Sequence, residues 1–226
     1  MVKKQAHFVV LMILLAALPA TSHAQDLNTI INNVTKAMGS ANLKTIRYSG
    51  SGSSYTPGKD ATWVKSYTRD LDLSAPLSRV QIVREQGTPP VEAKETQNVG
   101  TDAPWSKQFE LWTNPWEFVK AAEANHATVS SQTVFAQKFT VVTFMLQNRY
   151  KVSGFINDQN LIEKIQAWVD PNETLVETMY RDYQDFNGLN VAYPSKQRCN
   201  RTTSILIWIS CILPQLGPHI LGAQVN

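Results

Sequence analysis

Residues that could catalyse a reaction are few in this sequence. It contains four histidines, His7, His23, His126 and His219, and the first two lie in an N-terminal segment that we expect to be removed on export. A zinc site with three histidine ligands cannot be built from the remaining two. His126 is predicted at the end of a helix, where a histidine more often stabilises the C-terminal dipole than reacts. We therefore predict no catalytic residue, no metal site and no cofactor for this chain.

Two other polar patterns resemble sites. Asp182 and Asp185 could act as paired carboxylates, but carboxylates at strand ends and turns are far more often solvated or paired with a base such as Arg181. The run "SGSGS" at 49–53 looks like a phosphate-binding glycine loop, yet it lacks the third glycine and the Lys-Ser/Thr ending, and it continues a strand. We interpret it as a bend or bulge in an edge of the sheet.

Aromatic side chains are the stronger candidates for binding. The structural interpretation is an aromatic core. The functional interpretation is a concave apolar surface under a helical lid, which would hold an acyl chain or a hydrophobic protein segment. The candidate ligand-binding residues are Trp63, Trp112, Trp116, Phe118 and Trp168. Sequence alone does not distinguish a filled core from an open one.

Two helices are predicted to position these aromatics. Apolar residues recur at helical spacing over 26–38, and Gly39 stands where such a helix would end. A second helix begins with Asn114 as its cap and Pro115 at its first position, and it runs to about His126. Glu117, three residues after the cap, is expected to reach back to the backbone of Asn114.

Strands are predicted on both sides of the second helix. Two antiparallel strands join at Pro57-Gly58, and in the second of them Trp63, Tyr67, Leu71 and Leu73 share one face. Another strand covers 77–87, and the polar stretch 88–107 is predicted to be a long loop or lid. Strand-like runs follow at 133–146, 150–158, 161–170 and 174–186. With no alternation of strand and helix, the pattern favours an antiparallel meander of the α+β class.

The N-terminal residues indicate where in the cell the protein is located. The first 24 residues have a basic start at Lys3 and Lys4, an apolar run and a small-residue exit at Ala24, which is the pattern of a cleaved export signal. The apolar run is shorter than the roughly 20 residues that span a bilayer. We expect a mature chain from Gln25, periplasmic or secreted, without a transmembrane anchor. The net charge of +3 gives no support for a nucleic-acid partner.

Three segments carry a resemblance to a known family: "AMGSANLKTIRYSGSGS", "YKVSGFINDQNLIEKIQAWVD" and "LVETMYRDYQDFNGLNVAYPSK". They resemble the N-terminal region of bacterial exported metallo-β-lactamase-fold hydrolases, which is similar in turn to periplasmic lipoprotein-carrier and outer-membrane lipoprotein-sorting domains. The shared framework comprises Trp168-Val169-Asp170, Asp182-Tyr183, Gly188 and Tyr193-Pro194. The resemblance implies a curved antiparallel β-sheet partly wrapped around one or two helices. The zinc-binding His-x-His-x-Asp-His motif of those hydrolases is absent from this sequence, so no metal ligand is carried over.

The segment 199–226 differs from the rest of the chain, because it holds both cysteines, Cys199 and Cys211, and no acidic residue. One interpretation is a buried final strand, with a Cys199–Cys211 disulfide in an oxidising compartment. We favour translation in a shifted frame that ends the chain early, which predicts that Ile205 to Leu213 do not form a well-paired central strand. The predicted parts are a signal peptide at 1–24, a lipoprotein-carrier-like domain at 25–198 and an atypical tail at 199–226.

Together these observations predict a non-catalytic exported domain. It would bind an apolar ligand, such as a lipid or lipopeptide, or an apolar protein segment in the concave face of its sheet. The alternative is an accessory fragment of a secreted zinc-dependent metallo-β-lactamase-fold hydrolase, truncated before the catalytic domain. A third hypothesis is a purely structural envelope protein.

Overall fold

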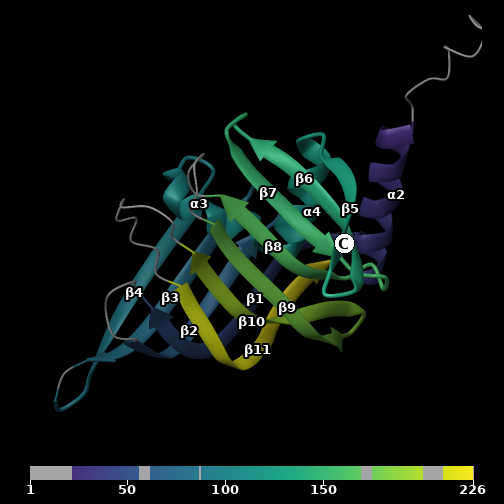
Figure 1. Ribbon diagram of the computed structural model, residues 1–226. Helices are drawn as coiled ribbons and strands as arrows, with labels where there is room; N and C mark the ends of the chain where they lie inside the picture. Colours follow the sequence, from purple (N-terminus) through teal and green to yellow (C-terminus); the bar gives the residue numbers. More distant parts are fainter. Residues whose placement is uncertain (1–21, 56–61, 87, 169–174, 201–210, 226) are drawn as a thin grey trace, which may run out of the picture.

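The computed structural model describes residues 22–55, 62–86, 88–168, 175–200 and 211–225. Within these residues the helices are α2 (Ser22–Ala37), α3 (Trp105–Trp112) and α4 (Pro115–Ala124). The strands are β1 (Leu43–Tyr55), β2 (Thr62–Asp72), β3 (Leu77–Gln86), β4 (Val91–Gly100), β5 (Thr128–Val134), β6 (Gln137–Leu146), β7 (Tyr150–Ile156), β8 (Ile162–Trp168), β9 (Leu175–Phe186), β10 (Leu189–Asn200) and β11 (Cys211–Val225). Figure 1 shows their arrangement.

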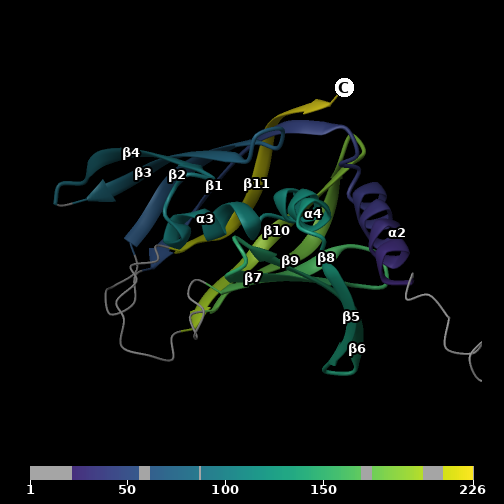
Figure 2. The same ribbon diagram turned by 90° about the horizontal axis from the view of Figure 1, so that it is seen from above.

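The strands form two antiparallel sheets. Sheet A has the order β11-β1-β2-β3-β4, and sheet B has the order β10-β9-β8-β7-β6-β5. Helices α3 and α4 lie between the two sheets, and α2 lies to one side (Figure 2). We call α3 and α4 the helix layer. The prediction of an antiparallel α+β fold is confirmed, but the strands form two sheets instead of the single curved sheet that was expected.

Helix α2 confirms the first predicted helix. It buries Leu27, Ile31 and Val34 on one side. Gly39 follows with φ +66°, and a Cβ at this position would overlap the backbone of Gly188. The end of the helix is also fixed by Asn190, whose Nδ2 donates to the carbonyl of Ala37 at 2.7 Å. Glycine suits this position because the backbone is left-handed and the backbone of Gly188 leaves no room for a side chain.

The segment 88–107 is not a loop, so that prediction was wrong. Val91–Gly100 forms β4, which pairs with β3 without interruption from Leu77↔Gly100 to Gln86↔Val91. Most β4 side chains are exposed, which is why the strand has no apolar alternation to recognise. Backbone hydrogen bonds to β3 therefore hold this polar segment in the strand conformation. The first three residues of α3, from Trp105 to Lys107, also lie within the expected loop.

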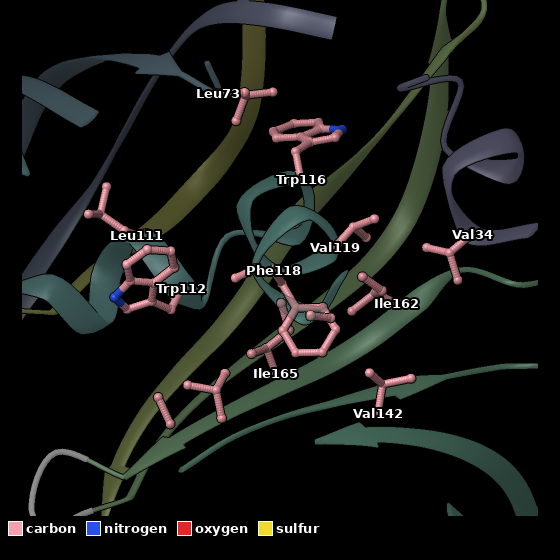
Figure 3. Close-up of a cluster of buried hydrophobic side chains, with 14 of the residues drawn as sticks. Val34, Leu73, Leu111, Trp112, Trp116, Phe118, Val119, Val142, Ile162 and Ile165 are labelled. Carbon is pink, nitrogen blue, oxygen red and sulfur yellow. The ribbon is translucent and has the colours of Figure 1, made fainter. Parts of the chain in front are cut away.

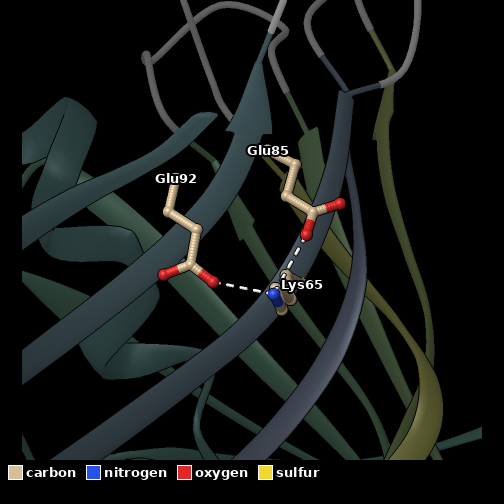
Figure 4. A network of polar contacts seen from close by, with 3 residues as sticks. All are labelled: Lys65, Glu85 and Glu92. Atoms are coloured by element: carbon tan, nitrogen blue, oxygen red, sulfur yellow. Dashed lines mark hydrogen bonds and ion pairs between the residues drawn. The ribbon is translucent and has the colours of Figure 1, made fainter. Parts of the chain in front are cut away.

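A β-bulge in β2 changes the face on which its first residues lie. Between Val64 and Ser66 the strand advances by two residues while β3 advances only from Arg84 to Val83. Val64 is therefore buried, and Trp63 is 45% exposed instead of sharing the buried face of Tyr67. Lys65 is exposed beside the bulge and bridges Glu85 of β3 at 3.0 Å and Glu92 of β4 at 2.7 Å (Figure 4).

The run "SGSGS" lies in β1, which pairs on both sides, with β11 and with β2. The register of β1 against β2 shifts between Gly50 and Gly52, but β1 advances by two residues and β2 by three, so the extra residue belongs to the bulge of β2 and not to this run. Its expected position at an edge was wrong. A Cβ on Gly50 would lie 2.9 Å from the hydroxyl oxygen of Tyr67, so this glycine leaves room for the Tyr67 ring to pack across β1.

Two hairpins of sheet B have two-residue turns with positive φ at both positions. One contains Asn187 and Gly188, with φ of 56° and 87°, and these residues suit such a turn. The other contains Phe135 and Ala136, with φ of 47° and 67°, and Phe135 is fully exposed. A bulky residue is unfavourable in this backbone region, so the second turn is held by the pairing of β5 with β6.

The tail contributes β11, which pairs antiparallel with β1 from Leu43↔Val225 to Tyr55↔Cys211. It is the outermost strand in the order of sheet A. Most of the segment Ile205 to Leu213 lies outside the described residues, as do 1–21, and the cysteine side chains are not described. The shifted frame, the disulfide, the export signal and the domain boundaries therefore stay predictions. No described helix has the length and apolar character needed to cross a membrane.

Candidate binding site in the helix layer

Three of the five predicted ligand-binding residues come together in the helix layer. Trp112 at the end of α3 and Trp116 in α4 are each 6% exposed, and Phe118 in α4 is fully buried. Figure 3 shows these three side chains within one cluster of buried apolar residues. Trp63 does not join them, because it lies on the exposed face of sheet A. Trp168, at the end of β8, is half-buried and lies outside the cluster.

Phe118 fixes α4 to sheet B. Its ring lies 5.3 Å from the ring of Phe144 in β6, measured between centroids. It also covers Gly154 in β7, where a Cβ would overlap the ring. In the close-up, Phe118 points toward Ile162 and Ile165 of β8 (Figure 3). Gly154 is therefore needed for close approach of the helix to the sheet.

Trp116 projects from a different side of α4. Its indole points toward Leu73, which follows the last residue of β2 in sheet A (Figure 3). The indole Nε1 of Trp116 is buried and has no hydrogen-bond partner, and the same is true of the Nε1 of Trp112. An indole N–H usually finds an acceptor when it is buried. The two tryptophans thus contribute apolar area together with two unsatisfied donors.

The junction of α3 and α4 is set by Thr113 and Asn114. The side chain of Asn114 accepts from the backbone N–H of Trp116 at 3.1 Å, which confirms the predicted cap. The backbone N–H of Asn114 donates to Leu111 at 3.1 Å, so Glu117 does not complete the capping box and that prediction was wrong. The phenol of Tyr180 in β9 donates to the carbonyl of Thr113 and ties the junction to sheet B.

Trp105 attaches the start of α3 to the same sheet. Its indole Nε1 donates to the carbonyl of Trp168 at 3.0 Å, and its ring stacks on Tyr150 with centroids 4.2 Å apart. The ring of Trp168 itself lies 4.6 Å from the Nζ of Lys151. Trp168 therefore anchors α3 through its backbone, while its side chain contacts the exposed Lys151 of β7.

Glu117 is the most unusual polar residue of the helix layer. Its side chain is fully buried, and neither carboxylate oxygen has a hydrogen-bond partner. Burial raises the pKa of this carboxyl to about 7, the nearby Lys120 ammonium lowers it, and the Asp72 carboxylate raises it. The Nζ of Lys120 donates to the carbonyls of Leu73 at 2.8 Å and Leu43 at 3.5 Å. A buried carboxylate without a partner is costly when ionised.

The other polar candidates take structural positions. Asp185 accepts from the backbone N–H of Gly188, at 3.1 and 3.2 Å to its two oxygens, and so stabilises the turn before β10. Asp182 is exposed, with φ 53°, and His126 is exposed just after α4. Within the described part of the chain, no three His, Cys, Asp or Glu side chains are grouped so that they could hold a metal ion.

The sequence pattern predicts Glu117 as a capping residue, whereas the structure places its side chain in the interior. The charged residues of α4, Glu117, Lys120 and Glu123, recur every three positions, a spacing typical of the solvent-facing side of a helix. The buried residues of α4 are Pro115, Trp116, Glu117, Phe118, Val119, Ala121 and Ala122. Lys120 and Glu123 are exposed, as this spacing indicates, whereas Glu117 is buried because the two sheets enclose the start of α4.

Comparisons with known proteins give only distant similarity. No family model matches the chain. No curated protein matches it either. A LolA superfamily protein from Nitrosomonas europaea has a similar solved structure, with a TM-score of 0.48 and 10% identity, covering 88% of this chain and 93% of that one. A DUF1329 family protein from Desulfovibrio piger gives a TM-score of 0.42 and 8% identity, covering 77% and 86% respectively.

Proposed function

We propose that this chain is a non-catalytic binding protein that holds the apolar chain of a lipid or lipopeptide between its helix layer and sheet A. The observation that carries the proposal is the set of buried polar atoms without partners on the helix layer, namely the Nε1 atoms of Trp112 and Trp116 and the carboxylate of Glu117. They are found among the largest aromatic side chains of the interior.

These atoms argue against a permanently closed core. Leaving a buried donor or acceptor unpaired costs on the order of 1–3 kcal/mol, and native proteins pair nearly all such groups. Four unpaired atoms on three neighbouring residues would be a heavy penalty for a structure that never opens. The penalty has a functional explanation if these residues meet solvent or ligand in a second conformation.

The contacts of the helix layer indicate where it would open. Phe118 on Gly154, Tyr180 on Thr113 and Trp105 on Trp168 all attach the layer to sheet B. Toward sheet A, the polar contacts found among the described residues are fewer: Lys120 donates to the carbonyls of Leu43 and Leu73, and Gln108 of α3 donates to the carbonyl of Thr101, just after β4. Separation from sheet A exposes Trp116 and Glu117 together and keeps the attachments to sheet B.

Bromine-labelled acyl chains test this site directly, because bromine quenches tryptophan fluorescence only in close contact. We expect saturable quenching of the purified chain by a brominated lysophospholipid. The Trp112→Phe/Trp116→Phe double variant should lose most of the quenching. Trp63→Phe is the matched control, because Trp63 lies on the exposed face of sheet A. This variant should retain the quenching. Quenching that does not saturate, or that depends on Trp63 and not on the helical pair, would disprove the proposal.

We also propose, from sequence features alone, that the protein is exported, because 1–24 has the pattern of an export signal. A role beside a metallo-β-lactamase-fold hydrolase domain rests on the sequence resemblance and on no contact of the structure. Cell fractionation with an antibody tests the first proposal. Co-purification of this chain with such a hydrolase from the native host tests the second.

A further inference from the structure

We propose that Glu117 selects the ligand by its polar end, so that the site prefers an amphiphile carrying an ammonium group over one carrying a carboxylate. This inference rests on the proposed function, because it names the class of molecule that enters the same site. It uses a different observation, namely the excess of negative charge at the side of α4 that faces sheet A.

Neither charged neighbour of Glu117 hydrogen-bonds to its carboxylate. Lys120, one turn further along α4, directs its ammonium to the carbonyls of Leu43 and Leu73. Asp72, at the end of β2, accepts from the backbone N–H of Ser74 at 2.8 Å and stabilises the following turn. Both residues act electrostatically on Glu117, yet no hydrogen bond from either reaches it.

The charges of these three residues favour a cation. Glu117 is buried, Asp72 is half-buried and Lys120 is exposed, so above the Glu117 pKa of about 7 these groups carry one net negative charge. The burial of Glu117 makes its charge interactions stronger than in water. A ligand ammonium would donate charge-assisted hydrogen bonds to both oxygens of Glu117. A ligand carboxylate would lie beside the carboxylates of Glu117 and Asp72 and would be repelled by both. The indole donors of Trp112 and Trp116 are neutral and do not offset this difference.

Ligands that share one apolar chain and differ in their polar group measure the contribution of the polar group to binding. Dodecylamine, dodecanoate and dodecanol should compete with the brominated probe in the order of amine first, alcohol second and carboxylate last. At about pH 8 we expect the amine to compete at a concentration at least roughly 10-fold below that of the carboxylate, equivalent to one decade in Kd. Glu117→Gln should bring the two within about 2-fold. Glu123→Gln, an exposed carboxylate on the same helix, is the matched control and should keep the preference.

Other results of the competition experiment would disprove either the role of Glu117 or the proposed function. Equal competition by amine and carboxylate in the unaltered protein disproves the role of Glu117, while leaving an apolar site in place. A preference that persists in Glu117→Gln, with its near-ultraviolet circular dichroism unchanged, disproves the role as well. Failure of all three ligands to compete, together with unsaturable quenching, disproves the proposed function and this inference with it.

Discussion

The ring of Phe118 in α4 lies directly over Gly154 in β7, at a position that a Cβ on this residue would have to share. The contact joins two residues that are 36 positions apart in the sequence. The absence of a side chain at Gly154 leaves room for the ring of Phe118, whose centroid lies 5.3 Å from that of Phe144. The helix layer is therefore held on one sheet by steric fit.

Gly154→Val tests this fit. The added side chain forces the ring of Phe118 out of its position, and we expect the free energy of unfolding to fall by about 1–3 kcal/mol, the usual cost of overpacking. The measurement is urea denaturation followed by circular dichroism. In a Phe118→Ala background the same substitution should cost less, because the ring is gone. An equal cost in both backgrounds would show that the two residues are not coupled.

Glu117→Gln should change the pH dependence of stability. The folded-state pKa of Glu117 is raised to about 7 from an ordinary value of 4.5, so the folded protein binds a proton that the unfolded chain releases between these values. Stability therefore falls as the pH rises from about 4.5 to above 7, at about 1.4 kcal/mol per pKa unit.

Glutamine carries no charge and avoids this loss. We expect Glu117→Gln to be more stable than the unaltered protein at about pH 8, by up to about 3 kcal/mol, and to differ least near pH 5. Denaturant titrations at several pH values provide the test, with Glu123→Gln as the exposed control. A constant difference between Glu117→Gln and the unaltered protein at every pH would contradict a raised pKa. The charged neighbours Lys120 and Asp72 remain in place in both proteins.

Tyr180→Phe should loosen the helix layer. Burial raises the pKa of the Tyr180 phenol well above its ordinary value, so it stays protonated and donates to the carbonyl of Thr113. Removing this hydroxyl should cost about 1–2 kcal/mol and increase hydrogen exchange in α3 and α4. Tyr183→Phe is the matched control, because its hydroxyl donates at 2.6 Å to Ile162, a strand residue of sheet B. Equal exchange in the helices of both variants would argue against a role for Tyr180 at the junction.

Replacing Phe135 and Ala136 by Asn and Gly should stabilise the β5–β6 hairpin. Both residues have positive φ, and Asn-Gly is the preferred sequence for such a turn. Phe135 is fully exposed, so its loss removes no packing. We expect a gain of about 1 kcal/mol in the free energy of unfolding. Asn187→Ala provides the reverse control in the other hairpin and should be destabilising. A loss of stability on the first change would show that Phe135 makes a contact worth more than the strain.

The sequence was sufficient where local rules decide the structure. The spacing of apolar residues predicts α2, and Asn114 followed by Pro115 predicts the start of α4. The strand-like runs of the second half correspond to β6 through β9, separated by the expected turns. Trp112, Trp116 and Phe118 were among the aromatic residues predicted to form either a core or a binding surface, and the structure places all three in the interior.

What the sequence alone determined, then, is the identity of most elements and the apolar character of the helix layer, since both follow from residues close together in the chain. Tertiary structure decided the rest. The polar segment β4 is a strand because its backbone hydrogen-bonds to β3. Trp63 faces outward because β2 has a bulge relative to both of its neighbouring strands, β1 and β3. Glu117 became a buried carboxylate because two distant sheets enclose its helix. Burial is a property of the surrounding elements, and the spacing of residues within one helix cannot specify it.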